Sequence, residues 1–192
     1  MDFRTRLFAA LLAFVPLPAA ADGVVDKIMT AADKTRLAGY EAARTKAIAE
    51  AKAGGGAQDV AVLDQILAKP PISFSDFDMT GNWQCRTVKV GGLGALVIYG
   101  WFKCKVTDDG SGWMLEKLTG SQRTKGRFYT ESDTRLIYLG SFYVAGDPAK
   151  PYGSGRESDQ VGYAVRTGPS EWRIELPLPE YESTLDVLEF RR

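Results

Sequence analysis

The N-terminal part of the chain has apolar residues at helical spacing. A capping box begins at Thr30, and Leu37 and Tyr40 belong to a stripe of apolar residues that recur on one helix face. Glycines at residues 54–56 end this helix, and a shorter second helix stops at a pair of prolines. The pattern predicts a helical hairpin over residues 22–70.

After a linker at residues 71–79, apolar and polar residues alternate. Trp172 and Ile174, for example, alternate with charged residues, which is typical of a strand with one buried face. Turn residues separate eight such runs, at residues 81–90, 96–106, 113–119, 125–130, 135–145, 160–167, 171–176 and 184–191. Short strands without helices between them indicate an antiparallel barrel or sandwich. Because eight strands suit a small closed barrel, we predict a barrel over residues 80–192. The expected fold class is mainly β with N-terminal helices (α+β).

The helical hairpin carries narrow, Ala-rich apolar stripes, and isolated helices of this length are marginal in water. We therefore expect the hairpin to dock on the barrel. The side chains that should make this contact are Leu37, Tyr40, Leu63 and Leu67. An eight-stranded barrel encloses a space that side chains fill or that holds one small ligand.

The first residues indicate export. Arg4 and Arg6 precede an apolar run at residues 7–17, and an A-x-A site follows, so we predict a signal peptide over residues 1–21 that is cleaved near Ala21. A buried core helix is the alternative interpretation. The run is shorter than the roughly 20 residues that a membrane-spanning helix needs. We therefore expect no membrane span.

The two cysteines, Cys85 and Cys104, lie on neighbouring predicted strands. In an exported protein they are expected to form a disulfide, since a redox-active pair would favour Cys-x-x-Cys spacing. A bridge requires close Cα atoms, so we expect a register with Trp83 near Val106 and a loop over residues 91–98. Closing a loop of about 20 residues stabilises the fold by roughly 3 kcal/mol.

The composition excludes several classes of function. The 24 basic and 24 acidic residues balance, which leaves no electrostatic footprint for nucleic acid. The chain contains no histidine, which removes Ser-His-Asp catalysis and His-containing zinc sites. We also find no phosphate-binding fingerprint or EF-hand loop, and expect neither cofactor nor metal.

Pairs of carboxylates remain in the linker and turns: Asp76 with Asp78, Asp108 with Asp109, Glu131 with Asp133, and Glu180 with Glu182. A glycosidase-type pair of acid and base is one interpretation. Solvated turn residues, whose side chains bond to their own backbone, are the interpretation we favour.

One basic run is a candidate for binding an anionic group. The run consists of Arg123, Lys125 and Arg127 near Tyr129, and Arg135 follows the next turn. Charges that protect the outer face of a hairpin are the alternative. The candidate aromatic residues for lining a pocket are Trp101, Tyr138 and Tyr163.

The run GNWQC at residues 81–85 resembles the opening signature of lipocalin-like small barrels. The resemblance implies that Gly81 and Trp83 begin the first strand, and that Trp83 plugs one end under an arginine of the last strand. Arg191, or its neighbour Arg192, would pack over the ring. The plan is also similar to that of exported bacterial metalloprotease inhibitors. Those proteins have a short extended N-terminus in place of a helical hairpin.

Nearly the whole mature chain resembles an exported bacterial family, the domain of unknown function DUF4893. The segments that carry the resemblance lie at residues 81–85, 99–104, 118–123, 127–129, 133–140, 181–183 and 185–189. The resemblance implies a periplasmic location and a non-enzymatic role, and it assigns no site.

These observations predict a periplasmic, non-enzymatic binding or structural module. Its partner would be an unknown small ligand or an envelope protein. One alternative is an inhibitor of an envelope or secreted hydrolase, which requires an exposed rigid loop or terminus. A hydrolase that uses carboxylates alone is a third hypothesis, and it requires an acidic pair in a cleft.

Overall fold

The computed structural model describes residues 22–192, in which four helices precede nine strands. The predicted signal peptide lies outside the described residues. The helices are α1 (Asp22–Ile28), α2 (Ala31–Ala38), α3 (Tyr40–Gly54) and α4 (Ala57–Ala68). None of these four helices has the length and apolar character needed to span a bilayer.

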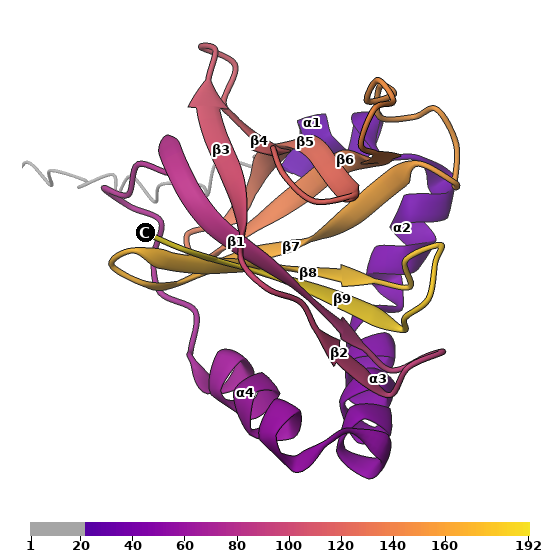
Figure 1. The fold of residues 1–192 in the computed structure, drawn as a ribbon. Coiled ribbons are helices and arrows are strands. Elements are labelled where there is room, and N and C mark those ends of the chain that lie inside the picture. Colours follow the sequence, from indigo (N-terminus) through magenta and orange to yellow (C-terminus); the bar gives the residue numbers. More distant parts are fainter. Residues whose placement is uncertain (1–21) are drawn as a thin grey trace, which may run out of the picture.

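Two local signals divide the first predicted helix. The Thr30 hydroxyl accepts a hydrogen bond from the backbone N–H of Asp33 and so starts α2, as the capping-box spacing predicts. Gly39 separates α2 from α3. The second predicted helix is α4, which diverges from α3 (Figure 1), and each of these two helices contacts the strands.

The strands form one antiparallel sheet that closes on itself. They are β1 (Gly81–Val90), β2 (Leu96–Ile98), β3 (Phe102–Asp108), β4 (Trp113–Lys117), β5 (Gln122–Ser132), β6 (Arg135–Val144), β7 (Asp159–Gly168), β8 (Glu171–Pro177) and β9 (Leu185–Arg191). β2 and β3 replace the single strand predicted at residues 96–106, and both pair with the same side of β1. Pairing of β1 with β9 completes an eight-stranded barrel, which confirms the predicted fold class.

The predicted disulfide is confirmed, but the predicted register is wrong. Cys85 and Cys104 are bridged, with Cα atoms 5.9 Å apart. Trp83 rather than Cys85 faces Cys104, so the bridge runs diagonally between β1 and β3. Because paired strands twist, one diagonal comes close enough for a disulfide. The expected pairing of Trp83 with Val106 therefore does not occur, and β2 occupies the last three residues of the expected 91–98 loop.

Aromatic side chains close one end of the barrel, which we call the sealed end. Trp172 stacks on Phe190 with ring centroids 3.6 Å apart, and it meets Trp83 edge-on at 5.7 Å. The indole N–H of Trp83 donates to the carbonyl of Met79. The linker buries three side chains in the same cluster, Phe74, Phe77 and Met79. The interior is therefore filled at this end.

The helices pack on the outside of the barrel, which confirms the docking expected from their apolar stripes. α3 and α4 meet β1 and β9 in a cluster of Ala47, Ala51, Leu63, Ile66, Val88, Val90, Leu185 and Val187, with Leu67 at its edge. α1 and α2 meet β6 and β7 in a cluster of Val25, Met29, Leu37, Ile137, Leu139 and Val161. Tyr40 meets Tyr163 edge-on, with ring centroids 4.9 Å apart.

A buried ion network fixes α3 to β8. The Glu175 carboxylate accepts hydrogen bonds from Arg173 Nε at 2.7 Å, Arg44 Nε at 2.8 Å and the Tyr40 hydroxyl at 2.8 Å. Burial alone would raise the pKa of Glu175, but the two arginines and Tyr40 outweigh it and lower the pKa. The carboxylate therefore stays ionised and holds the helix against the barrel.

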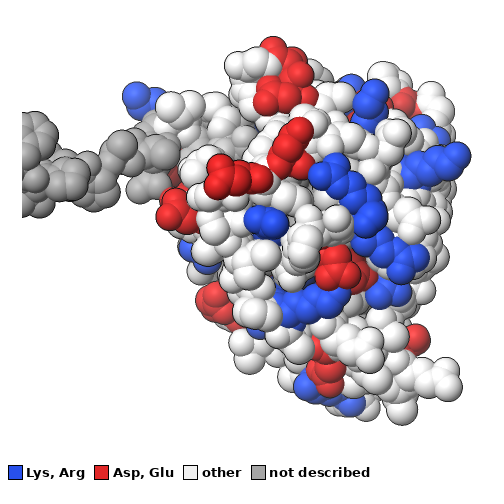
Figure 2. Space-filling view, turned by 90° about the vertical axis from the view of Figure 1, so that its left-hand side faces the viewer, with Lys and Arg blue, Asp and Glu red and all other residues white. Residues whose placement is uncertain are grey.

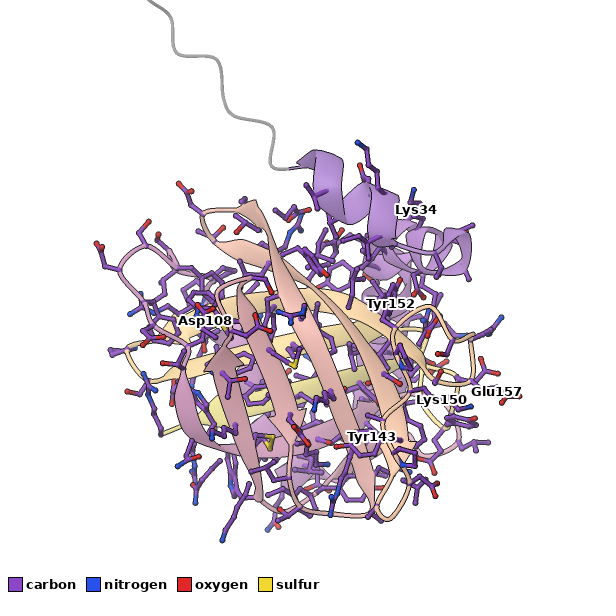
Figure 3. All side chains as sticks on the ribbon, turned by 90° about the horizontal axis from the view of Figure 1, so that it is seen from above. Lys34, Asp108, Tyr143, Lys150, Tyr152 and Glu157 are labelled. Carbon is purple, nitrogen blue, oxygen red and sulfur yellow. A yellow bond between two sulfur atoms is a disulfide. The ribbon has the colours of Figure 1, made fainter. Side chains whose placement is uncertain are left out.

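The loop at residues 145–158 carries Lys150, Tyr152 and Glu157 along the side of the barrel (Figure 3). Tyr152 ties this loop to α2, since its hydroxyl donates to the Asp33 carboxylate and accepts from the Thr30 N–H. The loop and the helix thus hold each other in place.

Candidate ligand site

The barrel end opposite the sealed end has a polar interior, and we call it the open end. Four loops surround it, at residues 91–95, 118–121, 145–158 and 178–184. Lys89 faces Asp186 across β1 and β9. The Thr124 hydroxyl hydrogen-bonds with the Tyr138 hydroxyl and the Gln160 amide oxygen. The inward-facing side chains are thus polar near the open end, whereas near the sealed end they are aromatic or aliphatic.

Lys89 is a buried cation with carboxylate partners. Its Nζ lies 3.4 Å from Asp186 and 3.1 Å from Glu182. Burial alone would lower the pKa of Lys89, but these two carboxylates outweigh it and raise the pKa. Burial raises the pKa of Asp186, while Lys89 and the Ser183 hydroxyl act in the opposite direction. The charge of Lys89 is therefore balanced within the barrel.

Lys117 is a buried cation without such a partner. Lys117 is 6 % exposed, and among the described residues no carboxylate forms an ion pair with its amine. Its Nζ lies 3.5 Å from the Thr87 hydroxyl and 4.3 Å from the centroid of the Phe102 ring. Burial, the charge of Lys89 and the charge of Arg123 lower the pKa of Lys117 to about 8, and Asp186 opposes them.

Two recesses enter the open end beside these charges. The first has a volume of about 80 Å³ and is lined by Thr87, Tyr99, Phe102, Lys117, Ser121 and Gln122. The second has a volume of about 30 Å³, and its lining includes Gln122, Phe142, Gln160, Tyr181 and Asp186. Spaces of this size hold a few water molecules or a small polar group, whereas sites for drug-sized ligands are about 300–1,000 Å³.

Two of the arginines predicted from the basic run lie outside the barrel. Arg123 and Arg127 line a wider hollow of about 730 Å³ between β4, β5, β6 and the 145–158 loop. Arg127 pairs with Asp109, and Arg123 Nε donates to the Gly120 carbonyl at 3.1 Å. On the face in Figure 2, Lys and Arg side chains intermingle with Asp and Glu side chains.

Arg135 and Tyr163 come together elsewhere on the outer surface. The Arg135 guanidinium lies 4.1 Å from the centroid of the Tyr163 ring and pairs with Glu131. Both residues line hollows between the helices and the barrel wall, rather than the open end.

The three aromatic candidates do not share one pocket. Tyr138 is buried inside the barrel and Tyr163 is outside it. Trp101 lies at the bend between β2 and β3, where the guanidinium groups of Arg86 and Arg191 lie 4.7 Å and 3.9 Å from its ring centroid.

The arginine over the plug tryptophan is the last residue of the chain. The Arg192 guanidinium lies 4.2 Å from the centroid of the Trp83 ring, and it donates to the carbonyls of Thr80 and Asp78. Arg191, the first choice from the sequence, lies over Trp101 instead. An arginine thus packs over Trp83, but it is Arg192, which follows β9, and not Arg191.

The carboxylate pairs predicted from the sequence lie in the linker and in or beside the turns at both ends of the barrel. In three of the four pairs, at least one carboxylate forms an ion pair with a lysine or an arginine. The contacts are Asp109 with Arg127, Glu131 with Arg135, Glu180 with Arg156, and Glu182 with Lys89. Over residues 22–192, no group of three or more His, Cys, Asp or Glu side chains is arranged to hold a metal ion.

Sequence reasoning missed the polar open end, although a signal for it exists. On β1, Lys89 has the same period-two phase as Trp83 and Cys85, and Asp186 has the same phase as Phe190 on β9. A charged residue in phase with buried aromatic residues indicates a buried charge.

One family model matches most of this chain. The model described as "Domain of unknown function (DUF4893)" matches residues 26–190. No curated protein and no solved structure matches the chain.

Proposed function

The chain belongs to the DUF4893 family. We propose that it is an exported, non-enzymatic module that binds a small polar ligand in the open end of its barrel. The signal-peptide pattern at residues 1–21 supports export to the periplasm, where the Cys85–Cys104 disulfide is stable. The absence of histidine supports a role other than catalysis.

The contrast between the two barrel ends carries the proposal. The sealed end is filled by stacked aromatic rings and other apolar side chains. Burial of polar and charged groups costs free energy unless partners compensate for it. The open end nevertheless buries Lys89, Lys117 and Asp186 beside two recesses. Lys89 and Asp186 pair with each other, but Lys117 has no carboxylate partner, and a ligand that pairs with Lys117 would offset the cost of burying it.

A variant that fills the recesses tests this proposal. Gln122 lines both recesses, so Gln122→Trp places a large side chain across them. Lys125→Trp is the matched control, because Lys125 is on the same strand but forms an ion pair with Glu116 on the outer face. The measurement is the melting temperature of each protein across a set of small polar and ionic metabolites.

We expect at least one compound to stabilise the wild type and Lys125→Trp but not Gln122→Trp. At 100 times its Kd, such a compound adds about 2.7 kcal/mol to the free energy of unfolding. The proposal is wrong if no compound raises the melting temperature of the wild type, or if every active compound stabilises Gln122→Trp equally.

The loop at residues 91–95 favours a second candidate, an inhibitor of an envelope hydrolase. Leu93 is 90 % exposed at its tip. The loop is held in place, since the Gly92 N–H donates to the Glu50 carboxylate at 3.0 Å and the Leu93 N–H donates to the Glu182 carbonyl at 2.8 Å. Gly92 has a φ of 87°, and a Cβ there would lie 2.4 Å from that carbonyl oxygen. A rigid loop with an exposed leucine suits insertion into an apolar cleft.

Inhibition assays on envelope proteases and muramidases test this second candidate. Wild type should inhibit one enzyme at one equivalent, Leu93→Asp should not, and Leu118→Asp, a change on another open-end loop, should behave as wild type. Equal inhibition by Leu93→Asp, or no inhibition by the wild type, would exclude the loop as the inhibitory element.

A further inference from the structure

We propose that the recess beside Lys117 binds the carboxylate group of a small organic acid. The inference rests on the binding function proposed above and gives the ligand its chemical class. It starts from a cation that is buried without a carboxylate partner and faces a recess in the barrel wall.

Of the two buried lysines at the open end, Lys89 forms ion pairs and Lys117 forms none. Lys89 has Asp186 and Glu182 as partners. Lys117 has a hydroxyl and an aromatic ring beside it, and neither carries a negative charge. A buried charge without a partner is costly, and a bound anion removes that cost.

The lining of the recess suits a carboxylate attached to an apolar body. Hydroxyl groups of Thr87 and Ser121 and the amide of Gln122 provide donors around Lys117. The volume of about 80 Å³ accommodates the carboxylate rather than a whole ligand. Tyr99, which is 40 % exposed, lines the same recess and offers aromatic surface to the remainder of the molecule.

The charged groups around Lys117 predict how binding depends on pH. They are Lys89 on β1, Arg123 on β5 and Asp186 on β9, and Tyr99 is the phenol in the recess. A carboxylate pairs with the protonated amine, so binding takes up a proton where the free amine is neutral. Because the pKa of Lys117 is lowered to about 8, affinity should be nearly constant below pH 8, down to the pH at which the ligand's own carboxyl group becomes protonated. Above pH 8, affinity should fall about tenfold per pH unit.

Isothermal titration calorimetry on the mature protein tests the inference with benzoate and acetate as probes. Benzamide supplies the same ring without the charge, and inorganic phosphate supplies a different anion, all at constant ionic strength set with sodium chloride. Lys117→Met removes the charge and keeps an apolar stem. Lys105→Met is the control, because Lys105 is exposed on β3. A second readout is the NMR titration of the Lys117 side-chain Cε resonance.

We expect benzoate to bind at least tenfold more tightly than benzamide. The affinity for benzoate should fall at least tenfold in Lys117→Met and stay within twofold of the wild type in Lys105→Met. In the NMR titration, bound benzoate should raise the titration midpoint of Lys117. The inference is overturned if Lys117→Met binds benzoate as tightly as the wild type does. It is also overturned if the wild type binds phosphate but neither benzoate nor acetate, or if it binds neither of the two acids. If neutral compounds stabilise the wild type but not Gln122→Trp, the binding function stands and the carboxylate inference is wrong.

Discussion

Replacement of Cys85 and Cys104 by alanine measures how strongly the bridge stabilises the barrel. The two residues are 19 apart in sequence, and closure of such a loop contributes about 3 kcal/mol in the chain-entropy model. Both residues are 1 % exposed, so loss of two buried sulfur atoms adds a cavity cost of about 1 kcal/mol. At about 2–4 °C per kcal/mol for a chain of this size, the melting temperature should fall by about 8–16 °C.

Urea denaturation at neutral pH compares the free energy of unfolding of the two proteins, and a thiol-reactive dye counts free thiols in the folded wild type. Because the sulfur atoms are buried, mild reductant should leave the folded wild type unchanged. A double-alanine variant within 1 kcal/mol of the wild type, or two reactive thiols in the native protein, would refute this reasoning.

Four further predictions follow from single contacts. Between pH 8 and 9.5, the free energy of unfolding of the wild type should rise relative to that of Lys117→Met. The pKa of Lys117 is lowered to about 8 in the folded protein, so over this pH range the unfolded chain binds more protons than the folded one, and urea titrations at three pH values check the sign. Glu175→Gln should cost about 3 kcal/mol at pH 7 by leaving buried arginine unpaired, and this difference should shrink as acid protonates Glu175 in the wild type. Arg192→Ala should lower the melting temperature more than Arg191→Ala, because Arg192 covers the sealed end and donates to two backbone carbonyls. A chain that begins at Phe74 should melt below the mature protein, because both outer clusters lose their helices.

The parts of the fold that depend on local patterns could be predicted from the sequence. Alternation along β8 places Trp172 and Ile174 in the interior, and recurrent turn residues separate the strands. The cap at Thr30 follows from a four-residue pattern. Docking of the helices could be predicted as well, since their apolar stripes need a partner.

Features that depend on contacts distant in sequence could not be predicted in the same way. The break between β2 and β3 and the diagonal bridge depend on the twist of the paired strands. Arg191 and Arg192 are adjacent, and the course of the chain beyond β9 decides which of them covers Trp83. Tyr138 and Tyr163 were grouped by residue type, although barrel closure places them on opposite sides of the wall.

The polar open end is harder to predict, because residue type does not show which strand lysines are buried. Lys89 and Lys117 are ordinary strand lysines by composition, and their burial follows from the phase of alternation and the position of neighbouring strands. Charged residues in short strands are usually solvated, so residue type alone does not distinguish these lysines from the arginines of the basic run. Those arginines lie on the outer surface, where Arg127 and Arg135 have carboxylate partners.

The location of ligand-induced changes in amide NMR spectra tests the central claim most directly. Spectra of the mature protein would be recorded with and without a small-molecule extract of the cell envelope. The account predicts chemical-shift changes that cluster on Thr87, Gln122 and Gln160, around the two recesses of the open end. Changes confined to the outer hollow or the Leu93 loop, or no changes at any extract concentration, would contradict it.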